Sequence, residues 1–409
     1  MAPEPLPPFG LAEGQPNCSA YFEKLQICPN ATMAEAGARW INFSTWTDST
    51  KWDAYPWTTQ YWYAMVGGSA SRFYDEFSPS SDTALEMTVS SGLRFTKSFS
   101  PRVANWTNTK HAAVQMWPSD NHRGYVIWRV NEVTTDADGG GSIAWEFDGG
   151  GWQLVQGPRA GVDIYHQQPC WFAVENVLEE LDSPGEYYHD HEARKLYFWP
   201  NTTTPFTGGS LEVTGGGLEV VVAIRGEDSG NVARNITLEG VEIAHSGQSY
   251  LTHPYEVPSD GDFAVRRAAA VFVENAHGTT ITRCKVERAG GNGIMLSNHV
   301  RHANISYNEV AWAGENSIVL MGRSNLNSGV GIDSYPSDNY LGHNHLHHHG
   351  VWGKNSAGFL QAVGMWNRVE YNVIHSGPRS GATYNDHFGG GDSFDGNLMF
   401  DAVRETSDQ

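Results

Sequence analysis

A recurring six-residue pattern between residues 238 and 399 constrains the fold of this chain more than any other feature. The pattern is an apolar residue, two variable residues, an asparagine or small residue, one variable residue and a second apolar residue. The copies are LEGVEI at 238, ITRCKV at 281, ISYNEV at 305, LGHNHL at 341, VEYNVI at 369 and FDGNLM at 394. Their starts lie 43, 24, 36, 28 and 25 residues apart. A constant minimum spacing between copies, lengthened by variable insertions, is typical of a β-solenoid, in which each rung closes at the same size while its loops vary in length.

A second apolar run follows four of these copies, at residues 293, 317, 357 and 381. Two or three short strands in each rung predict an all-β fold, a right-handed parallel β-helix of at least five rungs over residues 231–409. Side chains alternate between the two faces of a strand. Aligning the runs therefore predicts that Ile318 and Leu320 point inward together with Gly358 and Leu360, and that Gln361 points outward.

Stacked rungs place equivalent residues in columns. One predicted column is a ladder of buried amides that satisfies backbone groups in the turns. Its members are Asn308, Asn344, Asn372 and Asn397.

The histidine-rich run at 343–349 allows two interpretations. Alternation places His343, His345 and His347 on one face, which is a possible metal-ligand geometry. A stacked pair of His347 with His375 in the next rung is the simpler interpretation, and the sequence analysis therefore predicts no metal site. No cofactor is expected either.

Residues 1–230 are organised differently and contain most of the tryptophans and many irregular glycine-rich turns. They predict a β-rich, sandwich-like region that covers the first rung of the β-helix, because solenoid ends need protection from edge pairing. The segment from 186 to 199 predicts a hairpin with strands at 186–188 and 195–199. Cys18 and Cys28 are expected to form a disulfide in a loop-like segment.

Composition narrows the range of partners and compartments. A formal net charge of -20 disfavours nucleic acid and anionic membranes as partners. No apolar run is long enough to span a bilayer. Asn-X-Ser/Thr sequons indicate an extracellular glycoprotein, although no signal peptide is evident. They begin at Asn17, Asn30, Asn42, Asn105, Asn201, Asn235 and Asn304.

Several longer segments resemble a known superfamily. These are CWFAVENVLEELDSPGEYYHDHEARKLYFWPN at 170, PSDGDFAVRRAAAVFVENAHGTTITRC at 258, GPRSGATYNDHFGGGD at 377 and RETSDQ at 404. They resemble pectate-lyase-like right-handed β-helix proteins, and among these the carbohydrate-active members, including β-helix glycoside hydrolases. The resemblance covers roughly residues 150–409 and implies a polysaccharide or oligosaccharide as partner. The oligomeric state stays open.

The aligned C-terminal rungs suggest where a site would lie. The alignment ends inside a strand, and we expect the natural protein to continue beyond it. It brings Asp386 near Asp408 or Glu405 beside a glycine-rich loop, and two carboxylates about 5–10 Å apart are what glycosidic hydrolysis requires. Asp386 could equally be a turn-capping residue. The predicted substrate-binding residues around this pair are Arg379, Arg404, Gln361, Asn385, His387, Lys354 and Trp352.

Three functions follow from these residues and stay open at this point. The first is an extracellular glycoside hydrolase that uses the carboxylate pair. The second is a polysaccharide lyase or C5-epimerase, in which Arg379, Arg404 and Lys354 neutralise a uronate carboxylate. The third is a glycan-binding or structural β-helix without activity.

Overall fold

The computed structural model describes residues 61–66, 92–95, 103–117, 126–137, 141–150, 170–181, 186–199, 215–249, 255–256, 263–323, 334–385 and 388–402. Within these ranges the chain is almost entirely β structure, with one short 3-10 turn, η5 (Leu178–Glu180). No helix in the described part of the chain is long and apolar enough to cross a membrane.

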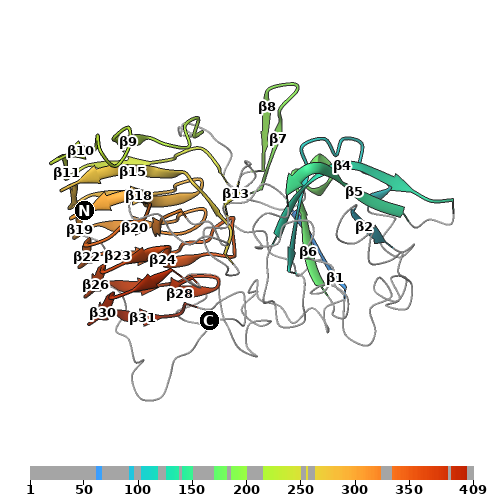
Figure 1. Ribbon diagram of the computed structural model, residues 1–409. Helices are drawn as coiled ribbons and strands as arrows, with labels where there is room; N and C mark the ends of the chain where they lie inside the picture. Colours follow the sequence, from blue (N-terminus) through green and yellow to red (C-terminus); the bar gives the residue numbers. More distant parts are fainter. Residues whose placement is uncertain are drawn as a thin grey trace, which may run out of the picture.

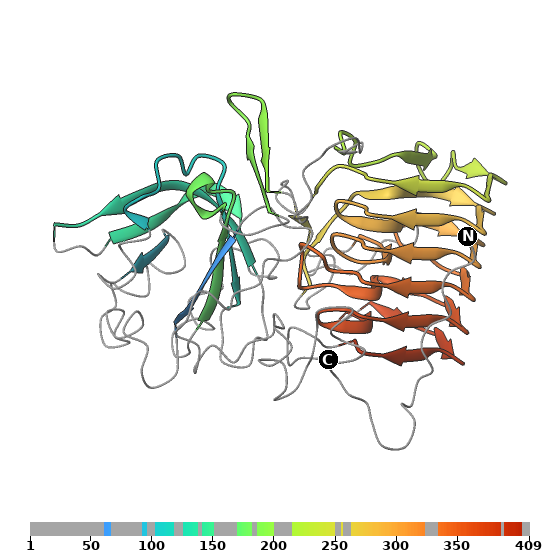
Figure 2. The same ribbon diagram turned by 180° about the vertical axis from the view of Figure 1, so that it is seen from behind.

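The described C-terminal part is a right-handed parallel β-helix with three parallel sheets (Figures 1 and 2). The first sheet contains β9 (Val222–Arg225), β10 (Ala233–Arg234), β15 (Ala269–His277), β18 (Asn292–Arg301), β21 (Ile318–Met321), β24 (Ala357–Ala362) and β28 (Ser380–Tyr384). The second contains β11 (Thr237–Glu239), β16 (Thr280–Thr282), β19 (Asn304–Ser306), β22 (Tyr340–Gly342), β26 (Arg368–Glu370) and β30 (Ser393–Asp395). The third contains β12 (Glu242–Ala244), β17 (Lys285–Glu287), β20 (Glu309–Ala311), β23 (His345–His347), β27 (Val373–His375) and β31 (Leu398–Phe400).

The predicted repeat register is confirmed along the second sheet. The first apolar residue of each repeat pairs with its equivalent in the next rung, in the order Leu238, Ile281, Ile305, Leu341, Val369 and Phe394. The coil interior is filled by aliphatic residues from all three sheets, including Ile294, Leu320, Val286 and Ile374. These side chains belong to a single cluster with members from successive rungs, so the core is continuous along the helix axis.

The predicted asparagine ladder is also confirmed. Asn308 donates to Asn344, Asn344 to Asn372 and Asn372 to Asn397 at 2.9–3.0 Å, and each side chain also bonds a backbone group of a neighbouring rung. Two further ladders were not predicted. Asn316 donates to Asn292, and Asn339 donates to Asn367.

The predicted alignment of the third run, which begins at residue 357, is wrong by one residue. Ile318 pairs with Phe359 and Leu320 with Gln361, so Phe359 points into the coil while Leu360 packs on the outer face of the first sheet. The correct alignment places Gly358 in the column of Gly293. A Cβ at either glycine would lie within 2.8 Å of a carbonyl oxygen of the following rung, so both positions exclude a side chain.

Each rung turns its corners on residues with positive φ. The corner after the third sheet is formed by His245, Arg288, Trp312, His348, Ser376 and Asp401, with φ between 49° and 59°. Non-glycine residues adopt this region rarely. Because one residue of each rung occupies this corner, the side chains of successive rungs stack on one another. The ring of His348 lies on that of Trp312, with centroids 4.1 Å apart.

The described N-terminal part is an antiparallel sheet of six strands beside the β-helix, and both views show the two side by side (Figures 1 and 2). Its strand order is β1 (Tyr61–Val66), β6 (Cys170–Glu175), β3 (Ala113–Trp117), β4 (Val126–Thr135), β5 (Gly141–Gly150) and β2 (Gly92–Phe95).

A separate antiparallel hairpin, β7 (Tyr187–Asp190) with β8 (Lys195–Phe198), confirms the hairpin predicted from 186 to 199. A small antiparallel pair, β13 (Tyr255–Glu256) with β14 (Val265–Arg266), belongs to an excursion from the rungs, and β25 (Gly364–Met365) pairs with β29 (Gly389–Gly390).

The cysteine and sequon predictions fall partly outside the described residues. Cys284 is free and buried in the coil, while Cys18 and Cys28 lie outside the described ranges. Asn105, Asn235 and Asn304 are exposed. The other four sequon asparagines lie outside the described part of the chain.

Candidate functional site

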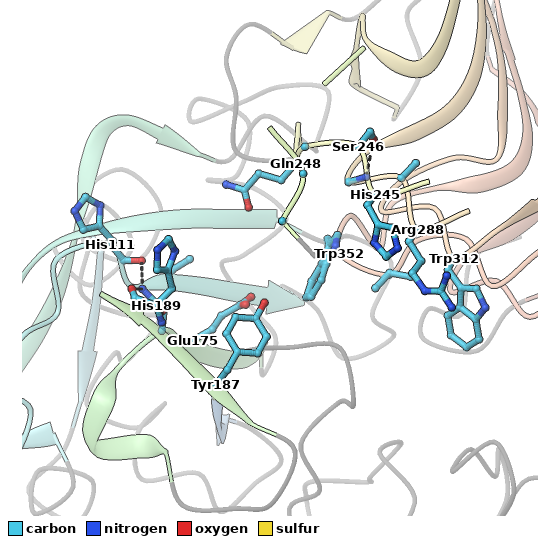
Figure 3. A pocket seen from close by; sticks show the side chains of 18 of the residues that line it. His111, Glu175, Tyr187, His189, His245, Ser246, Gln248, Arg288, Trp312 and Trp352 are labelled. Carbon is cyan, nitrogen blue, oxygen red and sulfur yellow. Dashed lines mark hydrogen bonds between the residues drawn. The ribbon is translucent and has the colours of Figure 1, made fainter. Parts of the chain in front are cut away.

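A cavity of about 900 Å³ lies between the N-terminal sheet and the turns of the β-helix (Figure 3). We call it the interface cavity. The residues that line it come from the end of β6, the hairpin, and the turns that follow the third sheet in successive rungs. They are His111, Ala113, Glu175, Asn176, Tyr187, His189, His191, Gly215, Gly216, His245, Ser246, Gly247, Gln248, Arg288, Ala289, Gly290, Trp312, Val351 and Trp352.

The sheet side of the interface cavity is held together by one asparagine. Asn176 follows β6 with φ of 60°, which turns its side chain toward the hairpin. Its Nδ2 donates to the carbonyl oxygens of His111 and His189 at 3.2 and 3.4 Å, and its Oδ1 accepts from the His189 amide at 3.1 Å. These bonds join the start of β3, the end of β6 and the hairpin, and they position Glu175 beside Tyr187.

Glu175 and Tyr187 form the acidic part of this wall. Glu175 is buried at the end of β6, and it is the sole carboxylate among the described residues that line the interface cavity. Burial raises the pKa of Tyr187 to about 12, and the charge of Glu175 adds to this effect. Tyr187 is therefore a neutral hydroxyl near neutral pH. Figure 3 shows the two side chains next to each other on the sheet side.

Three histidines extend the same wall. The ring centroid of His191 lies 4.7 Å from that of His111 and 4.0 Å from that of His189. Burial lowers the pKa of His191, followed by the positive charges of His189 and His111. These rings add hydrogen-bonding groups to the sheet side of the interface cavity.

The β-helix side contributes aromatic and cationic groups. Trp312 and Trp352 are half-buried, and Arg288 is 53% exposed and bonded to Glu287. Figure 3 shows Trp352, Trp312, Arg288 and Gln248 on this side, opposite Glu175. Half-buried tryptophans offer flat faces on which sugar rings can stack, while glutamine and arginine can bond hydroxyl groups.

Glycines allow the turns that form this wall to stack closely. A Cβ at Gly290 would lie 2.4 Å from the backbone carbon of Gly247, and one at Gly314 would lie 2.6 Å from the carbonyl oxygen of Gly290. The Gly290 amide donates to Ser246 Oγ at 3.0 Å. The close stacking brings the side chains of successive rungs onto one wall.

A buried carboxyl group supports the same turns from behind. Glu315 accepts from Tyr255 at 2.5 Å and from Ser249 at 3.2 Å. Burial raises the pKa of Glu315 to about 7, against the opposing effect of these two hydrogen bonds. The Glu315 carbonyl accepts from the Gly350 amide at 2.7 Å, which joins this residue to the turn that carries Trp352.

The sequence-predicted residues other than Gln361 fall into three groups. Trp352 lies in the interface cavity. The second group is buried and consists of Lys354, Arg379 and Asn385. Arg379 bonds Asn355, and its guanidinium lies 4.5 Å from the Phe263 ring centroid. The third group lies outside the described residues and consists of Asp386, His387, Arg404, Glu405 and Asp408.

Gln361 is buried because the register of β24 differs from the predicted one. Its Nε2 donates to the Gly364 carbonyl at 3.0 Å and to Asp392 at 2.9 Å, and its Oε1 accepts from Asn367 at 3.1 Å. The predicted role in substrate binding stays untested, but the amide already bonds three groups of the protein.

Most residues of the interface cavity were not predicted from the sequence. Glu175 and Tyr187 stand in the segment that carries the family resemblance, and Trp312 follows a repeat at the same position as Arg288 and His348. The equivalent positions of Arg288, Trp312 and His348 could be recognised in the sequence as a column of corner residues. Nothing in the sequence indicated that the N-terminal sheet faces that column.

Comparison with known proteins gives one informative match. Neither a protein-family model nor a curated protein matches the sequence. A solved structure described as a glycoside hydrolase is similar, with a TM-score of 0.57 and 16% sequence identity. The chain shares its fold with this glycoside hydrolase. The similarity covers 82% of this chain and 60% of the solved one, so the chain spans about 60% of that structure's length.

Proposed function

We propose that the chain is a carbohydrate-active protein that hydrolyses glycosidic bonds of an oligosaccharide or polysaccharide held in the interface cavity. One observation carries the proposal: two half-buried tryptophans on one wall of the interface cavity lie opposite Glu175 and Tyr187 on the other wall. The printed name of the structurally similar protein, a glycoside hydrolase, supports the same class of reaction. Sequons on exposed residues support an extracellular location.

The chemistry assigns a different task to each wall. Trp312 and Trp352 stack on sugar rings and fix the direction of the glycan, while Gln248 and Arg288 bond its hydroxyl groups. Glu175 acts as one of the two carboxyl groups that hydrolysis requires. The sequence-predicted pair of Asp386 with Asp408 or Glu405 stays a separate proposal for the two acids. Tyr187 stays protonated and donates a hydrogen bond.

Turnover on a panel of neutral polysaccharides tests this assignment. Glu175→Gln preserves the shape of the side chain and is expected to lower reducing-end release at least about 100-fold, because general acid or base catalysis typically contributes 10² to 10⁴. Asp386→Asn tests the separate pair of Asp386 with Asp408 or Glu405, and an equal loss of reducing-end release in this variant alone would favour that pair. Glu192→Gln, an exposed residue of the hairpin turn, is the matched control and should leave turnover unchanged. Full turnover by Glu175→Gln would contradict its role.

A polysaccharide lyase is the second candidate because Arg288 and His245 also line the interface cavity. A lyase needs a cation at the uronate carboxylate and a base for the neighbouring proton. Lyase products contain an unsaturated sugar that absorbs ultraviolet light, whereas hydrolysis releases reducing ends alone. Glycan binding without either product would favour the non-catalytic function.

A further inference from the structure

The outer face of the third sheet carries a histidine cluster outside the interface cavity. Leu346 of β23 points into the coil, so His345 and His347 on either side of it point outward. In the register of the sheet, His345 pairs with Glu309 of β20 and His347 pairs with His375 of β27. Three imidazoles and one carboxylate therefore come from three successive rungs.

The ring nitrogens of this cluster converge. The potential ligand nitrogens of His345, His347 and His375 all lie within 4.8 Å of one another. Nε2 of His345 lies 2.9 Å from Nε2 of His375. Nε2 of His347 is buried without a hydrogen-bond partner, and it lies 3.5 Å from Oε1 of Glu309.

A neighbouring bond fixes the nitrogen that His375 offers. Nδ1 of His375 lies 2.9 Å from Oγ of Ser376, and that hydroxyl donates to Asp401 at 3.1 Å. Because the hydroxyl proton is used on Asp401, Ser376 accepts from Nδ1 of His375, and the lone pair of His375 lies on Nε2. Nδ1 of His347 lies 2.8 Å from Nδ1 of His348, so Nε2 of His347 is the nitrogen that stays without a hydrogen bond. A carboxylate behind a ligating histidine, here through a serine, is a common feature of metal sites.

The chemistry of the four side chains suits metal binding. Lys285 is the nearby cation, and its Nζ is paired with Glu287 at 2.6 Å. Three imidazoles with one carboxylate form a donor set that zinc prefers.

Aromatic stacking explains only part of the cluster. The rings of His347, His375 and Phe400 form a stacked column, with centroids 5.2 and 4.7 Å apart. Phe400 shows that this column accepts an apolar ring. His345 lies beside the column rather than in it, and its Nε2 meets Nε2 of His375 at hydrogen-bond distance.

We propose that His345, His347 and His375, together with Glu309, bind a zinc ion on the outer face of the third sheet. Parallel rings cannot both direct an in-plane lone pair at one ion between them, so the His347 ring rotates out of the stack when zinc binds.

Zinc titration of the chelator-treated chain tests the proposal. The wild type is expected to bind about one zinc ion per chain, and cobalt in its place should give the visible absorbance of a four-coordinate site. His345→Ala and His347→Phe should abolish binding at the concentration that saturates the wild type. Ser376→Ala should weaken binding by about 10- to 100-fold, the usual effect of losing a partner of a ligating histidine.

His343→Phe is the matched control. His343 stacks between Tyr307 and Tyr371 in a neighbouring column, with centroids 4.8 and 5.3 Å away, and phenylalanine preserves that stack. This variant should bind zinc like the wild type. His347→Phe likewise preserves the stack with His375, and a thermal melt without metal verifies that it folds. Absence of zinc binding by the wild type, or equal loss in His343→Phe, would overturn the proposal.

Discussion

The β-helix and the N-terminal sheet use buried asparagines in opposite ways. In the β-helix, Asn344 is one member of a ladder, and the same two bonds recur at Asn308 and Asn372. In the sheet, Asn176 is a single joint that holds three segments distant in sequence. The β-helix therefore tolerates variation between rungs as long as its columns persist, whereas the sheet depends on individual contacts. The interface cavity takes its stacked wall from the first region and its acid from the second.

The largest expected effect concerns the continuous core of the β-helix. Leu320→Ala should lower the free energy of unfolding by about 2–5 kcal/mol, because the fully buried side chain contacts several rungs and leaves a cavity. Chemical denaturation measures the change. Leu398→Ala, at a side chain that is 48% exposed in the last described rung, should cost much less. Equal costs would contradict a core that is continuous along the axis.

The next effect concerns the buried acid behind the β-helix wall. The pKa of Glu315 is raised to about 7 in the folded chain, above its ordinary value of 4.5. The unfolded chain therefore loses its proton first as the pH rises. Stability should be complete below about pH 4.5 and fall between about pH 4.5 and 7, by about 3 kcal/mol at 1.36 kcal/mol per pKa unit.

Glu315→Gln is the control for this dependence. Glutamine bonds Tyr255 and Ser249 without titrating, so the variant should lose the fall in stability over that pH range. A series of denaturation curves from pH 4 to pH 8 gives the comparison. An identical pH dependence in both proteins would show that Glu315 is not the group responsible.

The asparagine ladder should give a smaller effect. Asn344→Ala removes the bonds to Asn372 and to the carbonyl of Ile305, and it leaves the Asn308 amide group without its acceptor. Loss of buried hydrogen-bond partners typically costs about 1–3 kcal/mol. Denaturation should give a value in this range, with the three β-helix sheets preserved in circular dichroism. A neutral substitution would mean that the ladder does not stabilise the turns.

The smallest effect on global stability should come from the joint in the sheet. Asn176→Ala removes three partly buried bonds within one region, and we expect about 1 kcal/mol of destabilisation. The same change frees the hairpin that carries Tyr187, so it should affect glycan binding more than Asn344→Ala does. A larger loss of glycan binding in Asn344→Ala than in Asn176→Ala would contradict the different roles assigned to the two asparagines.

The β-helix could be predicted from the sequence because each rung repeats the same pattern, so the alignment of one copy is supported by all the others. Six apolar positions from Leu238 to Phe394 agreed with one another, and four asparagines fixed the ladder. The third run failed because the alignment placed Ala357 in the column of Gly293, whereas Gly358 occupies that column and is the residue that the neighbouring carbonyl requires.

The N-terminal sheet offered no comparable repetition. Its strand order brings β1 beside β6 and places β2 at the far edge, and these pairings depend on contacts between distant segments. Glu175 became a site candidate only when the sheet was seen beside the corner column of Arg288 and Trp312. The predicted pair of Asp386 with Asp408 or Glu405 stays a prediction, because these residues lie outside the described ranges.

The affinity for an oligosaccharide chosen from the polysaccharide panel tests most directly whether the interface cavity is the glycan site. We compare the wild type with Trp352→Ala, and with Trp366→Ala at a tryptophan that is 54% exposed outside the interface cavity. Calorimetry should show affinity at least about tenfold weaker for Trp352→Ala, equivalent to 1.4 kcal/mol, because buried aromatic contacts dominate binding energy. Trp366→Ala should bind like the wild type. Unchanged affinity in Trp352→Ala, or an equal loss in Trp366→Ala, would contradict a glycan site between the sheet and the β-helix.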